Sequence, residues 1–113
     1  LTIKRAVFDS SEGKLEAVRV SSSTTEHDTK IDDELIGMIK SSKAVIADFT
    51  GNRTAVYYEA GFAMGLGIPV IWTCKKDDVD KLSFDTRRYP HIIWENEDDL
   101  YNQVVNRLKA KIL

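Results

Sequence analysis

The fold is decided by residues 44–74, which read AVIADFTGNRTAVYYEAGFAMGLGIPVIWTC. The apolar run at 44–47 is typical of a strand that is buried on both faces of a sheet. Residues 48–54 favour a turn, and residues 55–66 are apolar nearly all round, which predicts a buried helix. A second buried strand is expected at 68–74. A strand, a helix and a strand in succession favour an α/β architecture with a parallel sheet.

Glycine and proline set the limits of the central helix. Gly67 fits the residue that stops a helix, and Pro69 follows two positions later. Three small residues lie within the helix, and we expect them to let it approach the sheet closely: Gly61, Ala63 and Gly65.

Working outward, helical and strand-like segments alternate. We expect helices at residues 1–8, 28–41 and 97–112, and strands at 15–20 and 91–94. If this pattern forms a doubly wound parallel sheet, the first strand would lie in the middle of the sheet. That strand is missing here, and the chain begins with Leu1 rather than Met. We therefore expect residues 1–113 to be one domain from a longer protein.

Composition excludes several classes of protein. The chain has 113 residues, 42% hydrophobic, with 16 Lys and Arg against 18 Asp and Glu. This composition suits one globular domain, and the net charge of −2 gives no electrostatic case for nucleic acid or an anionic membrane. The single cysteine, Cys74, excludes an intramolecular disulfide and favours a reducing, cytoplasmic compartment.

No metal or cofactor motif stands out. The histidines His27 and His91 are far apart, and the acids at 77–80 lack the spacing of a calcium loop. The turn at 50–53 is not a phosphate-binding P-loop. Residues 54–74 carry one formal charge, but the Gly-rich break before Pro69 leaves two pieces too short to span a bilayer. We expect no metal, no cofactor and no membrane span.

The best candidate site follows the strand at 44–47. Ligands of open parallel sheets bind beyond the carboxyl ends of the strands, and Asp48 stands at such an end. The turn after it opens the central helix, whose free N–H groups suit an anion or a sugar hydroxyl. The turn residues expected to bind substrate are Thr50, Gly51, Asn52 and Arg53.

Glu59 is the sharpest feature of the central helix, because it is a lone carboxylate among apolar neighbours. Such a group is costly to bury unless something pairs with it. One interpretation is an ion pair with Arg53. The other is a crevice shared with Asp48, where two carboxylates can act on the anomeric carbon of a sugar or hold a ribose. Hydrogen bonds from Tyr57, Tyr58 or the turn would then keep Glu59 ionised.

The stretch from Ala47 to Ile71, with its DFTGNRTAVYYEAGFAMGLGIPVI pattern, resembles the nucleoside 2-deoxyribosyltransferase-like superfamily and its TIR-like nucleotide-binding relatives. The blocks at 31–36 and 82–89 also resemble family segments. The resemblance implies a flavodoxin-like, Rossmann-like three-layer sandwich with a parallel sheet. It also implies a nucleoside, nucleotide or NAD-like ligand. It makes Glu59 the nucleophile and Asp48 the residue that holds the sugar or protonates the base, with Tyr58 beside the substrate.

The resemblance leaves two functions open. The first is cleavage or transfer of an N-glycosidic bond. The second is a non-catalytic TIR-like module that senses a nucleotide or binds a protein, because the Tyr-Tyr-Glu form at residues 57–59 is commoner in the nucleotide-binding branch. Relatives often complete their sites across a subunit interface, which makes a homo-oligomer a further expectation.

Overall fold

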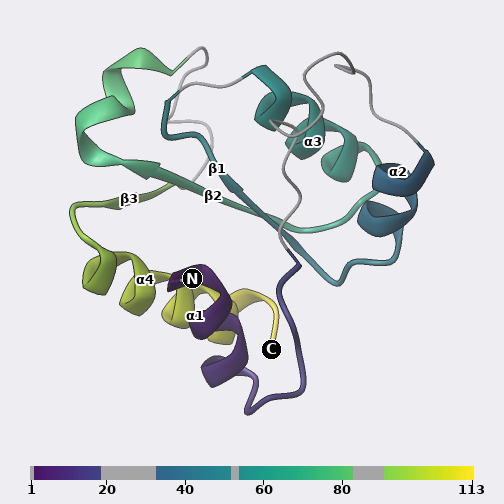
Figure 1. The fold of residues 1–113 in the computed structure, drawn as a ribbon, viewed down its shortest axis with the longest axis horizontal. Coiled ribbons are helices and arrows are strands. Elements are labelled where there is room, and N and C mark those ends of the chain that lie inside the picture. Colours follow the sequence, from purple (N-terminus) through teal and green to yellow (C-terminus); the bar gives the residue numbers. More distant parts are fainter. Residues whose placement is uncertain (1, 19–32, 52–53, 83–90) are drawn as a thin grey trace.

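Strand β1, Val45–Asp48, carries the predicted site residue Asp48 at its carboxyl end. The computed structural model describes four parts of the chain: residues 2–18, 33–51, 54–82 and 91–113. β1 pairs in parallel with β2, Val70–Lys75, which pairs in parallel with β3, Ile92–Trp94. The order β1-β2-β3 brings the carboxyl ends of the three strands to one edge of the sheet (Figure 1). The predicted parallel α/β architecture is confirmed at this level.

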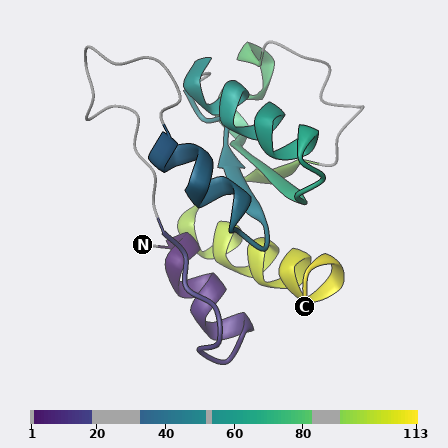
Figure 2. The same ribbon diagram turned by 90° about the vertical axis from the view of Figure 1, so that its right-hand side faces the viewer.

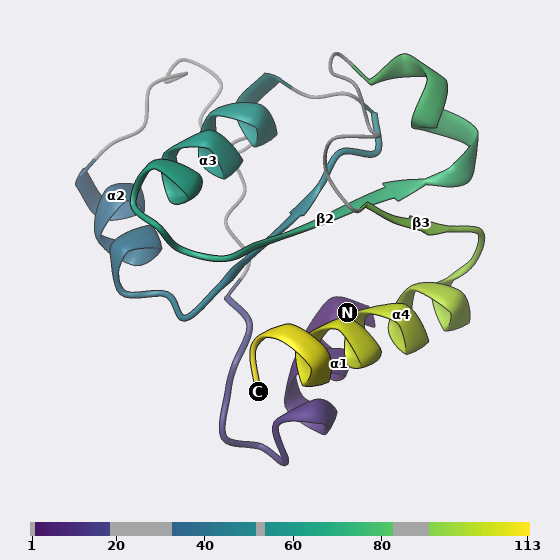
Figure 3. The ribbon, with the colours of Figure 1, turned by 180° about the vertical axis from the view of Figure 1, so that it is seen from behind.

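Helices cover both faces of the sheet. One face carries α1, Thr2–Ser10, and α4, Glu97–Lys111, which lie side by side (Figure 2). The other face carries α2, Asp33–Lys40, and α3, Thr54–Gly65, as the view from behind also shows (Figure 3). The layers follow from alternation along the strands, since Ile71 packs toward α4 and Trp72 packs toward α3.

The larger core lies beneath α1 and α4. Three side chains of α4 are buried there, and each burial contributes about 1.5–3 kcal/mol: Leu100, Val104 and Leu108. Helix α4 begins where Asn96 accepts a hydrogen bond from the N–H of Asp99, at 2.8 Å. The cap binds a free N–H group of the first turn, and the acidic residues of that turn interact favourably with the positive end of the helix dipole. The predicted start of this helix is confirmed.

The smaller core lies beneath α3. The Phe49 ring stacks on the Trp72 ring with centroids 5.0 Å apart, and Ala60 and Ala63 are fully buried against the sheet. The prediction that α3 is buried all round is wrong, because Tyr58 is 65% exposed and Met64 is 43% exposed. A helix in the outer layer is covered only on its inner side, whatever the polarity of its outer residues.

The glycines of α3 differ from the prediction as well. Gly61 and Gly65 are exposed, and a Cβ at either position would meet nothing within 4 Å, so neither makes a close approach to the sheet. Gly67 does end the helix as predicted. Its φ of +78° lets Ile68 N–H donate to the Ala63 carbonyl and Gly67 N–H to the Met64 carbonyl.

The predicted strand at 15–20 is wrong over residues 15–18, which form no strand. Leu15 and Ala17 pack against the larger core, but this segment has no strand beside it among the described residues to complete a ladder. After β2 the chain forms a 3-10 helix, η2, Lys76–Lys81. Residues 19–32 and 83–90, with the predicted first turn of α2 and most of the block at 82–89, lie outside the described residues.

Across the described parts of the chain, every helix is either too short or too polar to cross a lipid bilayer.

Candidate functional site

Asp48 is held in a fixed arrangement at the carboxyl end of β1. Its Oδ1 accepts from the Thr50 hydroxyl at 2.7 Å and from the Thr50 N–H at 3.2 Å. The same Thr50 hydroxyl accepts from the N–H of Lys75 at 2.9 Å, which ties the turn to the end of β2. One carboxylate oxygen is thus engaged by the turn, and the arrangement preorganises the strand end.

The next residue of the turn is tied to η2. Gly51 adopts a φ of +88°, a conformation that favours glycine, and its N–H donates to Asp78 Oδ2 at 2.8 Å. The other oxygen of Asp78 lies 3.7 Å from the Lys81 ammonium. The Gly51 N–H is therefore already bound by a carboxylate of the protein itself.

Glu59 lies on one flank of α3. Ala60 and Ala63 are buried and define the inner side of the helix. Glu59 precedes Ala60 by one residue and Ala63 by four, so its side chain lies beside this inner side. Tyr57 is on the other flank, because two residues advance about 200° around a helix. Its ring lies 4.7 Å from Phe49, in the cluster that reaches Trp72 of β2. Glu59 therefore lies on the flank of α3 that faces away from this aromatic cluster.

The pKa of the Glu59 carboxyl group reflects its burial. Its side chain is partly buried, and the loss of hydration raises the pKa of the carboxyl above its ordinary value. In the described parts of the chain no hydrogen bond or ion pair reaches this carboxyl group. Glu59 thus pays a desolvation penalty that the described residues do not offset.

The relation of Asp48 to Glu59 follows from strand alternation. Ala47 and Phe49 pack toward α3, whereas Ile46 packs toward the core under α1 and α4. Because side chains alternate along a strand, Asp48 lies on the same face as Ile46, which is the face opposite to α3. Asp48 and α3, which carries Glu59, therefore lie on opposite faces of the sheet, and no described hydrogen bond joins the two carboxyl groups.

Among the described residues, none of the other predicted site residues makes a hydrogen bond to Glu59. Tyr58 is on the outward face of α3, and within the described residues its hydroxyl makes no hydrogen bond to Glu59. Asn52 and Arg53 lie outside the described residues, and with them the predicted Glu59–Arg53 ion pair. Of the expected substrate-binding residues, Thr50 and Gly51 are the ones placed beside Asp48, at the carboxyl edge.

Sequence reasoning missed two contributions to this edge. The sequence shows Asp78 only as one of the acidic residues at 77–80. An acidic residue three positions after a strand carries no signal that it will bind a distant turn. Thr73 pairs in register with Asp48, and its hydroxyl is buried without a hydrogen-bond partner among the described residues. A buried hydroxyl in this state costs on the order of 1–3 kcal/mol.

Cys74 is a free, buried cysteine of the sheet. Its side chain is fully buried in β2. Burial, followed by the negative charges of Asp48 and Asp78, raises the pKa of the thiol to about 11. The thiol therefore stays protonated at neutral pH and is a poor nucleophile.

Comparisons with family models, with curated proteins and with solved structures find no match to this chain.

Proposed function

We propose that this chain is a flavodoxin-like domain that binds a nucleoside or nucleotide and cleaves or transfers its N-glycosidic bond through Glu59. The observation that carries the proposal is the state of that carboxyl group. It is partly buried, its pKa is raised, and the described residues offer it no partner. A group in this state is a functional-site candidate, because a ligand can supply the interaction that the protein lacks. The motif resemblance around residues 47–71 supplies the ligand class.

The reaction that we propose begins with ionised Glu59. One carboxylate oxygen attacks the anomeric carbon as the bond from that carbon to the base nitrogen breaks, and the base leaves with the electron pair. The base takes a proton from Asp48 or from water. The resulting glycosyl ester on Glu59 is then opened by water, in hydrolysis, or by a second base, in transfer. The developing positive charge on the sugar favours the ionised carboxylate that burial alone disfavours.

Asp48 has a supporting role in this proposal. Oδ1 is engaged by Thr50, so Oδ2 is the oxygen that we assign to a sugar hydroxyl or to the leaving base. The contacts from Thr50 to Lys75 and from Gly51 to Asp78 support the assignment, because they fix the strand end on which Asp48 stands. The free Cys74 thiol is in keeping with a reducing, cytoplasmic setting.

The test is incubation with a panel of nucleosides, nucleotides and NAD, with released base measured by chromatography. We expect release by the parent chain and a loss of at least about 10³-fold in Glu59→Gln, because the amide cannot form the glycosyl ester. Glu34→Gln is the matched control, since Glu34 is an exposed helical glutamate, and it should keep the parent rate.

Two other outcomes separate the alternatives. Thermal stabilisation by a nucleotide, without release of base from any member of the panel, would support the non-catalytic sensing module instead. Equal release by Glu59→Gln and the parent chain would remove Glu59 from the reaction.

A further inference from the structure

Two consecutive backbone N–H groups of the turn after β1 are bound by carboxylates of the protein itself. The Thr50 N–H donates to Asp48 Oδ1 at 3.2 Å, and the Gly51 N–H donates to Asp78 Oδ2 at 2.8 Å. Successive N–H groups of a turn at the start of a helix are the groups with which many proteins bind phosphate. Asp48 and Asp78 therefore already hold the donors that a phosphate would need.

The same carboxylates make the surroundings of this turn negative. The Asp78 side chain is 20% exposed, so solvent screens its charge only in part, whereas its ion-pair partner Lys81 is 70% exposed and 3.7 Å away. Burial is the main cause that raises the pKa of the Cys74 thiol, and the charges of Asp48 and Asp78 raise it further. The negative charge of the two carboxylates thus extends to the buried end of β2.

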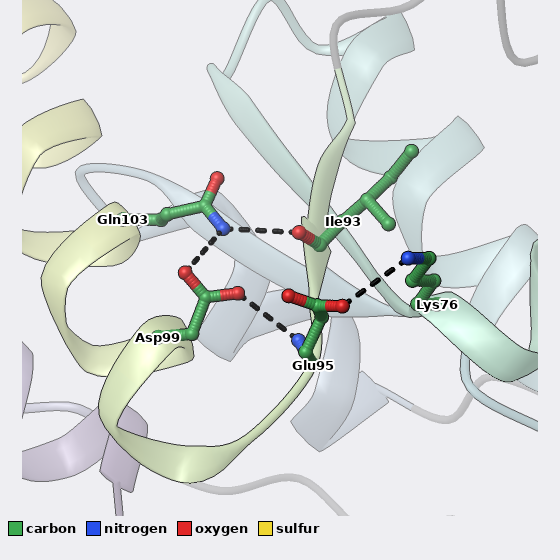
Figure 4. A network of polar contacts seen from close by, with 5 residues as sticks. All are labelled: Lys76, Ile93, Glu95, Asp99 and Gln103. Atoms are coloured by element: carbon green, nitrogen blue, oxygen red, sulfur yellow. Dashed lines mark hydrogen bonds and ion pairs between the residues drawn. The ribbon is translucent and has the colours of Figure 1, made fainter.

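The lysines at the end of β2 have partners on the side of β3. The Lys75 ammonium lies 5.8 Å from the centroid of the Trp94 ring, and Lys76 Nζ pairs with Glu95 Oε1 at 3.2 Å (Figure 4). Because β2 lies between β1 and β3, these contacts are on the far side of β2 from the turn that follows β1. The two ammonium groups are therefore placed to neutralise the end of β3 rather than a phosphate at the turn.

We propose that Asp78 is a specificity-determining residue of the candidate site, which makes the site favour a neutral nucleoside over its phosphorylated nucleotide. The inference rests on the proposed function, in which Asp48 binds the sugar. A phosphate on that sugar would meet a carboxylate where it needs an N–H donor, and bringing like charges together costs affinity. A neutral nucleoside avoids this repulsion, and its hydroxyl groups can donate to Asp48 Oδ2.

The variant that tests the proposal is Asp78→Asn. It removes the charge and keeps a carbonyl oxygen that can accept from the Gly51 N–H. Asp80→Asn is the matched control, since it makes the same change of charge at an exposed aspartate of η2. Asp78→Ala removes the acceptor as well and serves as the second variant. Circular dichroism confirms that each variant is folded.

Affinity is measured by equilibrium dialysis in the Glu59→Gln background, so that no ligand is consumed. The probes are adenosine, guanosine, cytidine, uridine and thymidine, each paired with its 5′-monophosphate. We expect the nucleoside that binds to do so at least about tenfold more tightly than its monophosphate. Asp78→Asn and Asp78→Ala should reduce this preference by about tenfold, whereas Asp80→Asn should keep it.

The salt dependence supplies a second readout that a change of shape alone would not produce. The preference for the nucleoside should shrink as salt is added to protein with Asp78 intact, because the repulsion is screened, and it should change little in Asp78→Asn.

The proposal is overturned if no nucleoside binds, if the monophosphates bind as tightly as the nucleosides while Asp78 is intact, or if folded Asp78→Asn keeps the full preference. Failure of the parent chain to release base is a different result. It would overturn the proposed reaction and leave this assignment standing, because the dialysis requires no chemistry.

Discussion

Helices α4 and α3 use their carboxylates in opposite ways. At the start of α4, Glu97 accepts from the Thr2 hydroxyl of α1, and Asp99 accepts from the Glu95 N–H and from Gln103. In α3, Glu59 accepts no hydrogen bond from any described residue, although it is less exposed than Glu97. The carboxylates of α4 therefore stabilise the structure itself. Glu59, which has no such structural contact among the described residues, is the carboxylate for which we propose a ligand.

The largest expected effect is on stability, and it compares the core beneath α3 with the core beneath α4. Phe49→Ala removes a fully buried ring beneath α3, and Leu100→Ala removes a buried side chain beneath α4. We expect the free energy of unfolding to fall by about 3–5 kcal/mol in the first and about 2–5 kcal/mol in the second, measured by urea denaturation. Only Phe49→Ala should also lower base release per folded molecule. Equal loss of activity in both variants would contradict the division between the layers.

The next effect concerns the strand end that carries Asp48. Thr50→Val deletes the hydroxyl that donates to Asp48 and accepts from the Lys75 N–H. We expect a loss of about 1–3 kcal/mol in the free energy of unfolding, because two partners lose their hydrogen bond. Thr50→Ser keeps the hydroxyl and should retain most of the stability. If the valine and serine variants melt together, the hydroxyl does not hold this turn.

A smaller effect of opposite sign is expected on the outer face of α3. Gly61→Ala should raise the free energy of unfolding by about 0.5–1 kcal/mol, because the added methyl meets nothing and the unfolded chain loses freedom. Gly67→Ala is the control, and its φ of +78° should make that variant less stable by about 1–2 kcal/mol. Thermal melts of both variants would show whether the outer face of α3 is open.

The smallest effect is the pH dependence that Glu59 contributes. Because burial raises the folded-state pKa of this carboxyl, the native protein binds more protons than the unfolded chain between the two pKa values. Its favourable contribution is complete below the unfolded pKa, about 4.3, and is lost as pH rises through the folded pKa. Glu59→Gln should therefore be more stable than the parent at neutral pH. This advantage should shrink in acid, which denaturation at a series of pH values would measure.

The central strand-helix-strand unit could be predicted from the sequence, because local signals coincide there. The apolar run ending at Asp48 and the stop at Gly67 each mark a boundary that the structure confirms. Burial around α3 could not be predicted in this way. An apolar helix such as the one carrying Tyr58 has the same sequence pattern whether one side or every side is covered, and only the number of layers decides between them.

The sequence predicts individual residues of the candidate site, but it does not predict how they lie relative to one another. Asp48 and Glu59 stand out by type and position, but their relation depends on strand alternation and on the side of α3 that meets the sheet. The contact from Gly51 to Asp78 joins residues that are 27 positions apart, and the hydrogen bond from Gln103 to the Ile93 carbonyl joins α4 to β3 (Figure 4). Long-range polar pairs of this kind leave no periodic signal in a single sequence.

The most direct test of the central claim is the mass of the Glu59 peptide after an acid quench during turnover of whichever nucleoside or nucleotide releases base. We predict an added sugar on the peptide that contains Glu59, and none in Glu59→Gln. Release of base by the parent chain with no sugar on that peptide at any time, together with undiminished release by Glu59→Gln, would contradict the claim.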